Sequence, residues 1–264
     1  MVNGELEIST AGFCTMNCYF CPQEFYQKAY KGVKFLSPED FKAALSNVPN
    51  DVILDFSGFN EPFINPCAVD MIEYARERGH PVDIFSTLVG LKPEDVKRLA
   101  KLNIERFTLH LPDNLGNAKI PITEEYRETL TEVLTTLRID AFSIMNNNFK
   151  NIGRAGLSRG AKRFHKKGFF YCTHLTHSDF VMLPNCDVVL CPQDFGLKHV
   201  LGNLLKQSYM DILNSKDLKR IQRNMFTLDG DVLCRGCELA VSPFLFGRRT
   251  WLKLLLKTLS FQSS

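Results

Sequence analysis

Three cysteines near the start of the chain have the spacing of a metal-cluster loop. Cys14, Cys18 and Cys21 lie in the segment GFCTMNCYFCP, separated by three residues and then by two. Three thiolates on one short loop can hold three irons of a four-iron cluster and leave the fourth iron open to a ligand. A zinc site would need a fourth Cys or His nearby, but the next cysteine is Cys67 and the first histidine is His80. A redox dithiol would use two thiols and leave Cys14 unexplained.

A second set of cysteines lies in the C-terminal half of the chain and ends in a CxxC pair. Its members are Cys172, Cys191, Cys234 and Cys237. Four thiolates make a closed site, which suits either a structural zinc ion or an iron–sulfur cluster. The spacing alone does not decide between these two occupants.

Length and composition indicate a soluble globular protein. The 264 residues, 45% hydrophobic and 23% charged, can bury a full core in one large domain or in one domain with an extension. We predict a cytoplasmic location, because the sequence shows no signal peptide and no apolar run long enough to span a bilayer. In such a reducing compartment cysteine clusters bind metal rather than form disulfides. A net charge of +3 is too small to indicate a nucleic-acid partner.

Strands and helices alternate through the N-terminal half of the chain. Short runs rich in β-branched or aromatic residues predict strands at 6–9, 52–56, 82–85, 106–110 and 139–145. Capping residues and apolar periodicity predict helices at 37–46, 66–78, 92–101 and 123–137. The alternation predicts an α/β fold with a parallel sheet and right-handed crossovers. The cysteine loop follows the first strand, where an α/β barrel places its ligand site.

The first cysteine loop resembles a known signature. Its spacing, with the aromatic Phe20 directly before Cys21, is similar to the CxxxCxΦC motif of the radical S-adenosylmethionine (radical SAM) enzymes. The resemblance implies a SAM-binding [4Fe–4S] cluster whose electron cleaves SAM to a 5′-deoxyadenosyl radical that abstracts hydrogen from substrate. It also implies a partial (β/α)5–6 TIM-like barrel and an external electron donor such as flavodoxin or ferredoxin.

The segment after the second predicted strand extends this resemblance. Residues 57–62, SGFNEP, are similar to the GGEP loop with which the family binds the amino group of SAM, although Asn60 stands where the family often has Gly. A glycine lets backbone approach a ligand, and a carboxylate pairs with an ammonium. Further positions of the SAM site are implied at the ends of the third and fourth strands. The cofactor-binding residues implied by the resemblance are Phe20, Gly58, Asn60, Glu61, Ser86, Thr87 and His110.

The second cysteine set and the segment around it resemble the SPASM and twitch subfamily. No cysteine follows Cys237, so the resemblance implies one auxiliary [4Fe–4S] cluster, the shorter twitch arrangement, on Cys172, Cys191, Cys234 and Cys237. The layout is most similar to the 2-deoxy-scyllo-inosamine dehydrogenase family. The stretch 151–156, NIGRAG, resembles that family's N-x-x-R-A-G, whose arginine faces the substrate, and this implies a catalytic role for Arg154.

These features divide the chain into three predicted parts. Residues 1–160 form the radical SAM barrel core, 161–240 the auxiliary-cluster region and 241–264 a basic amphipathic tail. The tail, with leucines on one helical face and Arg and Lys around it, is expected to dock on the barrel or to touch an anionic membrane surface or a partner.

The sequence favours an oxidoreductase that dehydrogenates a polar, hydroxylated small molecule, with the auxiliary cluster as electron acceptor. One alternative is a radical SAM maturase that modifies a peptide. Another is an epimerase, in which Cys67 or Cys186 would donate a hydrogen atom. The non-enzymatic alternative is a zinc-stabilised binding or scaffold protein.

Overall fold

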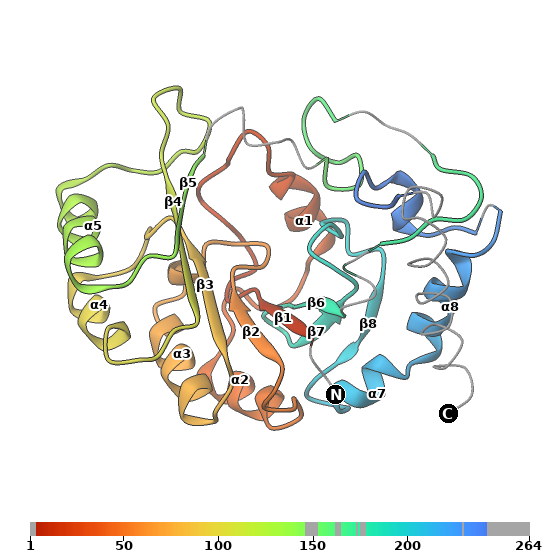
Figure 1. Cartoon of the computed structure of the whole chain (residues 1–264), viewed down its shortest axis with the longest axis horizontal. Coiled ribbons are helices and arrows are strands. Elements are labelled where there is room, and N and C mark those ends of the chain that lie inside the picture. Colours follow the sequence, from red (N-terminus) through yellow and green to blue (C-terminus); the bar gives the residue numbers. More distant parts are fainter. Residues whose placement is uncertain are drawn as a thin grey trace.

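The computed structural model describes residues 4–145, 153–161, 165–172, 174, 178–228 and 230–241. Within these residues eight strands form one sheet in the order β5-β4-β3-β2-β1-β6-β7-β8 (Figure 1). The strands β1 to β6 run parallel, whereas the pairs β6–β7 and β7–β8 are antiparallel. The strands are β1 (Glu5–Ile8), β2 (Ile53–Phe56), β3 (Val82–Ser86), β4 (Arg106–Leu111), β5 (Ala141–Ile144), β6 (Asp179–Met182), β7 (Asp187–Val189) and β8 (Val200–Asn203).

Helices connect the parallel strands and lie along the outer side of the sheet, where α3, α4 and α5 follow one another (Figure 1). Local sequence sets where they begin. Ser37 Oγ accepts a hydrogen bond from Asp40 N at 3.0 Å, and Pro38 occupies the first helical position. Thr123 caps α5 in the same way. The helices are α1 (Gln23–Ala29), α2 (Pro38–Leu45), α3 (Ala68–Glu77), α4 (Pro93–Leu99), α5 (Glu124–Thr136), α7 (Tyr209–Leu213) and α8 (Lys216–Asn224), with 3-10 turns η1 (Pro62–Ile64) and η2 (Leu233–Gly236).

The structure confirms the predicted α/β fold and its partial barrel. The five predicted strands and four predicted helices of the N-terminal half are all present, with ends that differ by a few residues. The sequence did not predict α1, the short helix directly after the cysteine loop. Seven residues with little apolar periodicity give a weak helix signal, and tertiary packing of Tyr26 decides the outcome.

The C-terminal region joins the barrel through its sheet. Strand β6 pairs in parallel with β1, so that Glu7 lies opposite Val181, and β7 and β8 extend the sheet from there. The sheet thus runs across the predicted boundary at residue 160, and the division into 1–160, 161–240 and 241–264 stays a prediction. Of the predicted tail 241–264, residues 242–264 lie outside the described residues. No described helix is long and apolar enough to cross a membrane.

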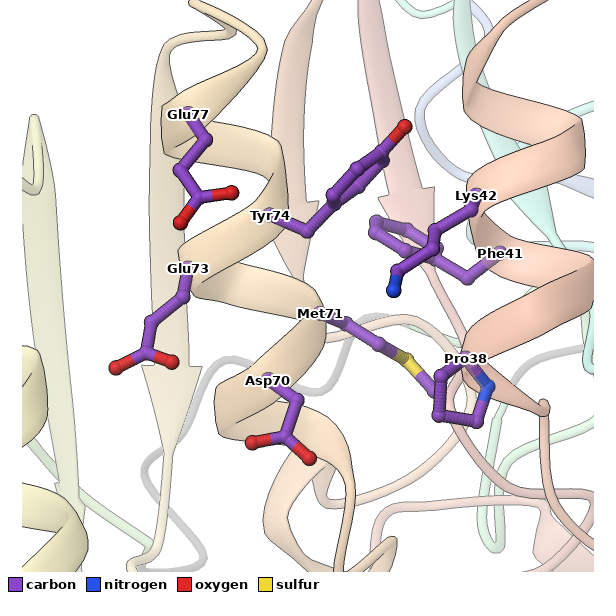
Figure 2. A pocket seen from close by; sticks show the side chains of 8 residues that line it. All are labelled: Pro38, Phe41, Lys42, Asp70, Met71, Glu73, Tyr74 and Glu77. Atoms are coloured by element: carbon purple, nitrogen blue, oxygen red, sulfur yellow. The ribbon is translucent and has the colours of Figure 1, made fainter.

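A shallow groove of about 260 Å³ lies outside the barrel, between α2 and α3 (Figure 2). Two contacts stabilise the side chains that line it. The Lys42 ammonium lies 5.3 Å from the centre of the Tyr74 ring, and Glu73 pairs with Arg98 at 2.5 Å. Met71 and Phe41 line the groove and belong to the packing between the two helices. The groove contains no thiol, so the chemistry predicted from the cysteines must lie elsewhere.

Candidate functional site

A larger cavity, of about 490 Å³, opens at the carboxyl ends of the barrel strands. The cysteine loop after β1, the 57–61 loop after β2 and the ends of β3 and β4 line it, as an α/β barrel requires of its ligand site. The C-terminal region supplies the remaining wall. Predicted site residues in the lining are Cys14, Cys18, Phe20, Cys21, Gly58, Asn60, Glu61, Thr87, His110 and Arg154.

The first cysteine loop is a tight turn at one end of this cavity. Cys21 N donates to Cys18 O at 3.0 Å, and Asn17 takes a left-handed φ of 42° that lets the loop reverse. Burial is the main reason that the pKa of the Cys18 thiol is raised, and the charges of Cys21 and Cys14 raise it further. Burial likewise raises the pKa of Cys21, while the Arg154 guanidinium opposes the rise. The three thiols therefore lie within electrostatic reach of one another.

The 57–61 loop rests on residues that follow β1. Gly58 has a φ of 60°, and a Cβ built there would lie 2.3 Å from Ser9 Oγ, so only glycine fits. The next backbone amide, Phe59 N, donates to Ser9 Oγ at 2.8 Å. Asn60 Nδ2 donates to Thr10 Oγ1 at 3.0 Å. These contacts fix the loop beside the cysteine loop.

The structure brings three of the predicted SAM-binding residues together. Ser86 Oγ donates to Glu61 Oε1 at 2.6 Å, and Thr87 donates to Glu61 Oε2 through N and Oγ1, both at 2.7 Å. Burial raises the pKa of Glu61, and these hydrogen bonds oppose the rise because they stabilise the carboxylate. Glu61 therefore links the end of β3 to the 57–61 loop, a structural role that the sequence did not predict.

We expect Glu61→Gln to weaken SAM binding by on the order of 1.5–3 kcal/mol. The amide carries no charge to attract an ammonium, and its NH2 group cannot accept a hydrogen bond from Thr87 N. Calorimetric titration of SAM into the anaerobically reconstituted protein measures the effect. Glu39→Gln, at an exposed position in the first turn of α2, is the matched control. Equal SAM affinity in both variants would mean that Glu61 does not contribute to SAM binding.

His110 also lines the cavity, on β4. Burial lowers the pKa of this histidine to about 4, so it is neutral at physiological pH. Its ring centre lies 6.0 Å from that of Phe85, which lines the same wall. A neutral imidazole suits a hydrogen bond or stacking contact with a ligand better than it suits binding an anion.

Arg154 lies in a turn that joins the two cysteine regions. Arg154 and Ala155 have left-handed φ values of 48° and 53°, a costly conformation for residues with a Cβ. Arg154 Nη1 donates to Pro192 O at 2.8 Å, and its guanidinium lies 5.3 Å from the centre of the Phe195 ring. Ser158 Oγ donates to Phe20 O at 2.9 Å. The turn thus connects the first cysteine loop to the segment after Cys191. The strained backbone at Arg154 lies in the wall of the cavity.

The second cysteine set also forms one group. Cys172, Cys191, Cys234 and Cys237 are all buried. Burial raises the pKa of Cys234, and neighbouring Cys172 and Cys237 add to the rise. Burial likewise raises the pKa of Cys191, with Cys234 and Cys172 contributing. Cys191 and Cys237 are thus each near Cys172 and Cys234, which places the four thiols in one group.

The sequence did not single out Arg235, which lies inside the CxxC pair. Only 1% of its surface is exposed, and it lies 5.1 Å from the centre of the Phe170 ring. A charged residue between two predicted ligand cysteines looks like an exposed turn residue in the sequence, so nothing there signals its burial. Its guanidinium donates to the backbone carbonyls of Gly230, Lys166, Gly168, Asn224 and Thr227.

The donors present fit iron–sulfur clusters. The first loop offers three grouped thiols beside a cavity that can admit a further ligand, and the second set offers four buried thiols. Within the described part of the chain, no three His, Cys, Asp or Glu side chains converge on a single ion position. Ligands of a cluster surround a body of several atoms, so their sulfurs need not converge as those of a zinc site do.

Family models match both cysteine regions. The model of the Radical SAM superfamily matches residues 8–115, and the SPASM model, described as an iron-sulfur cluster-binding domain, matches residues 172–238. The two ranges include all seven predicted ligand cysteines. Comparison with curated protein sequences gives no match.

Solved structures share the fold at low sequence identity. BtrN in complex with AdoMet and 2-DOIA has a TM-score of 0.63 and 15% identity, covering 85% of this chain and 87% of that one. SuiB of Streptococcus suis bound to the precursor peptide SuiA has a TM-score of 0.56 and 14% identity, covering 90% and 70%. Native anSMEcpe with bound AdoMet and Cp18Cys peptide has a TM-score of 0.53 and 13% identity, covering 89% and 86%.

These matches fix the cofactor class, which is SAM with a [4Fe–4S] cluster in the barrel and an auxiliary iron–sulfur cluster in the C-terminal region. They also exclude the zinc scaffold as the best account of the chain, because both cysteine regions match iron–sulfur families. The chain belongs to the radical SAM superfamily and carries a SPASM-type iron–sulfur region after its partial barrel.

Proposed function

We propose that this radical SAM enzyme is a dehydrogenase that oxidises an alcohol carbon of a polar small molecule. The observation that carries the proposal is the position of the second cysteine region against the cavity. Pro192 and Gln193, directly after Cys191, and Leu239, two residues after Cys237, line the same cavity as the first cysteine loop. A substrate in the cavity would thus lie between the two sets of thiols.

The proposed ligand sets are Cys14, Cys18 and Cys21 for the first cluster, and the four C-terminal cysteines for the second. When bound, the first cluster supplies the electron that cleaves SAM, and the second offers an acceptor for the electron that an oxidised substrate gives up. The protein's own residues position these partners. Glu61 and the 57–61 loop would hold the SAM amino group, and Arg154 would face the substrate from the wall that Pro192 shares.

The positions of the two candidate hydrogen donors argue against the epimerase alternative. Cys67 lies at the start of α3, and Cys186 lies in the β6–β7 turn, where its thiol is fully buried and lies 3.8 Å from Asp40 O. The cavity lining includes neither thiol. Peptide modification stays the second candidate, because the structure of SuiB with a precursor peptide shares this fold. We also propose a cytoplasmic location and an external electron donor of the flavodoxin or ferredoxin type.

Replacing Cys234 and Cys237 together by alanine tests the proposal. SAM cleavage should partly survive, since the first loop is intact, while oxidised product should disappear because the electron acceptor is gone. Chromatography of 5′-deoxyadenosine and of substrate products, from reactions under strong reductant, measures both. Cys67→Ala, outside the cavity, is the matched control and should change neither quantity. An epimer with a solvent-derived hydrogen as the wild-type product would refute the dehydrogenase assignment.

A further inference from the structure

The first cysteine loop has one side toward the cavity and one side toward solvent, and its residues alternate between the two. The residues that line the cavity are Cys14, Met16, Cys18 and Phe20. The residues that alternate with them and are exposed to solvent are Thr15, Asn17 and Tyr19. A molecule bound to the outer side of this loop would therefore be separated from the thiols by a single layer of chain.

The loop after β4, residues 113–119, borders the outer side of the cysteine loop. Tyr19 N donates to Asn117 O at 2.7 Å, and Lys119 N donates to Met16 O at 2.9 Å. These two backbone hydrogen bonds join the loops edge to edge, so their exposed side chains belong to one surface.

This surface is mainly basic. We call the exposed side of residues 13–35 and 113–119, both fully described by the structure, the loop face. The exposed charged residues of the loop face are four lysines and one acid, namely Lys28, Lys31, Lys34, Lys119 and Glu24. Asp113 is half-buried, and its carboxylate accepts hydrogen bonds from Asn117 N and Nδ2. The loop face thus concentrates positive charge in a chain whose net charge is only +3.

Lys34 brings this charge to the edge of the cysteine loop. Its ammonium lies 5.2 Å from the centre of the Phe13 ring, and Phe13 directly precedes Cys14. Phe35 packs against Phe13 with 5.6 Å between the ring centres and so supports the same contact. Within the described residues, neither Lys34 nor Lys119 forms an ion pair. Both charges are therefore available to an acidic partner.

Two large apolar side chains are exposed between these charges. Tyr19 is 49% exposed, and Leu115, in the turn that Asp113 and Asn117 close, is 66% exposed. Apolar and aromatic side chains inside a charged rim are typical of a protein-binding surface. The loop face therefore suits a protein partner whose own surface is acidic.

We propose that the loop face is the docking surface for an acidic electron-transfer protein, which reduces the first cluster across the cysteine loop. This inference rests on the proposed function, which requires an external donor, and it adds the place where the donor binds. One electron leaves the flavin or iron–sulfur group of the donor and enters the oxidised first cluster, and no bond forms or breaks. The loop face suits this step because electron transfer slows steeply with distance, and because opposite charges speed the encounter.

The test compares two reductants on the reconstituted full-length protein saturated with SAM. Reduced flavodoxin is an acidic protein that must dock, whereas dithionite is small and needs no docking surface. The rate of 5′-deoxyadenosine formation is measured against the concentration of each. Lys34→Glu combined with Lys119→Glu should raise the flavodoxin concentration that gives half the maximal rate by about tenfold or more. The same variant should match the wild type with dithionite.

Two further variants control for charge and for position. Lys34→Arg combined with Lys119→Arg keeps both charges and should behave as wild type with flavodoxin. Lys101, before β4 begins, and Lys206, after β8 ends, are exposed lysines outside the loop face. Lys101→Glu combined with Lys206→Glu makes the same change of net charge and should leave the flavodoxin dependence unchanged.

Calorimetry with oxidised flavodoxin supplies a second readout that needs no turnover. The wild type should bind it more tightly than the variant with Lys34→Glu and Lys119→Glu, and salt should weaken the wild-type binding more than that of the variant. Tyr19→Ser should weaken binding as well, because it removes the exposed aromatic side chain without changing the charge.

The outcomes separate the docking surface from the proposed function. Equal losses with flavodoxin and dithionite would mean that the two lysines support the cysteine loop itself, and would overturn the docking surface. Unchanged flavodoxin dependence and binding in the charge-reversed variant would also overturn it. A wild type that forms no 5′-deoxyadenosine with either reductant would contradict the proposed function instead, and the calorimetric comparison would still decide whether the loop face binds the donor.

Discussion

Replacing Cys14, Cys18 and Cys21 together by alanine should leave about four irons per chain, where the anaerobically reconstituted wild type holds about eight. The same variant should form no 5′-deoxyadenosine under strong reductant. The reason is that the chain offers two separate thiol groups, three beside the open cavity and four in the buried C-terminal site. Iron and sulfide analysis together with chromatography of the nucleoside measures both effects.

The four-cysteine site provides the reciprocal control. A variant without Cys234 and Cys237 should also hold about four irons, yet it should still cleave SAM. A wild-type protein with one cluster's iron and one zinc would contradict the electron-acceptor role of the second site. A wild-type protein that cannot cleave SAM would contradict the assignment of the first.

Arg235→Met should lower the free energy of unfolding by about 3–5 kcal/mol, a large part of the stability of an ordinary domain. Methionine fills similar space but donates no hydrogen bonds, so five backbone carbonyls, in the segments 166–168 and 224–230, would lose this partner. Each unsatisfied buried group costs about 1–3 kcal/mol. Iron in the C-terminal site should fall as its loops loosen, while the first cluster stays. Denaturant titration and iron analysis test both parts.

Arg220→Met is the matched control for this change. Arg220 lies on the exposed face of α8, where it pairs with Asp217 at 3.2 Å, and an exposed pair of this kind contributes about 0–1 kcal/mol. Comparable losses in the two variants would mean that burial of Arg235 does not stabilise the site. Full iron content in Arg235→Met would show that the cysteines hold their arrangement without it.

The sequence predicted the repeating part of the fold well, because its signals are local. Caps such as Ser37 and Thr123, and short β-branched runs, mark each element where it begins. The spacing of the cysteines and the SGFNEP segment predicted the cavity lining for the same reason: a loop after a parallel strand has a fixed place in a barrel. Ser86 is the exception among these residues, since its hydroxyl turns to Glu61 and the lining does not include it.

What the sequence could not predict depends on contacts between distant segments. The pairing of β6 with β1 joins residues about 170 positions apart in the chain, and no local pattern encodes it. The donors to Glu61 come from the end of the next strand, and the carbonyl partners of Arg235 come from two segments, 166–168 and 224–230. The alignment of Glu7, Asp55 and Asp83 across β1, β2 and β3 becomes visible only when the register of these strands is known.

The pairing of β6 with β1 has a consequence for how the protein unfolds. Because β6 pairs with one side of β1, the strand that leads into the first cysteine loop is interior rather than at an edge, with neighbours on both sides. A chain cut before β6 would leave the backbone amides and carbonyls of β1 open along that side, a ready template for aggregation. The barrel and the auxiliary-cluster region should therefore melt as one cooperative unit, so that loss of the auxiliary cluster should also destabilise the proposed SAM site.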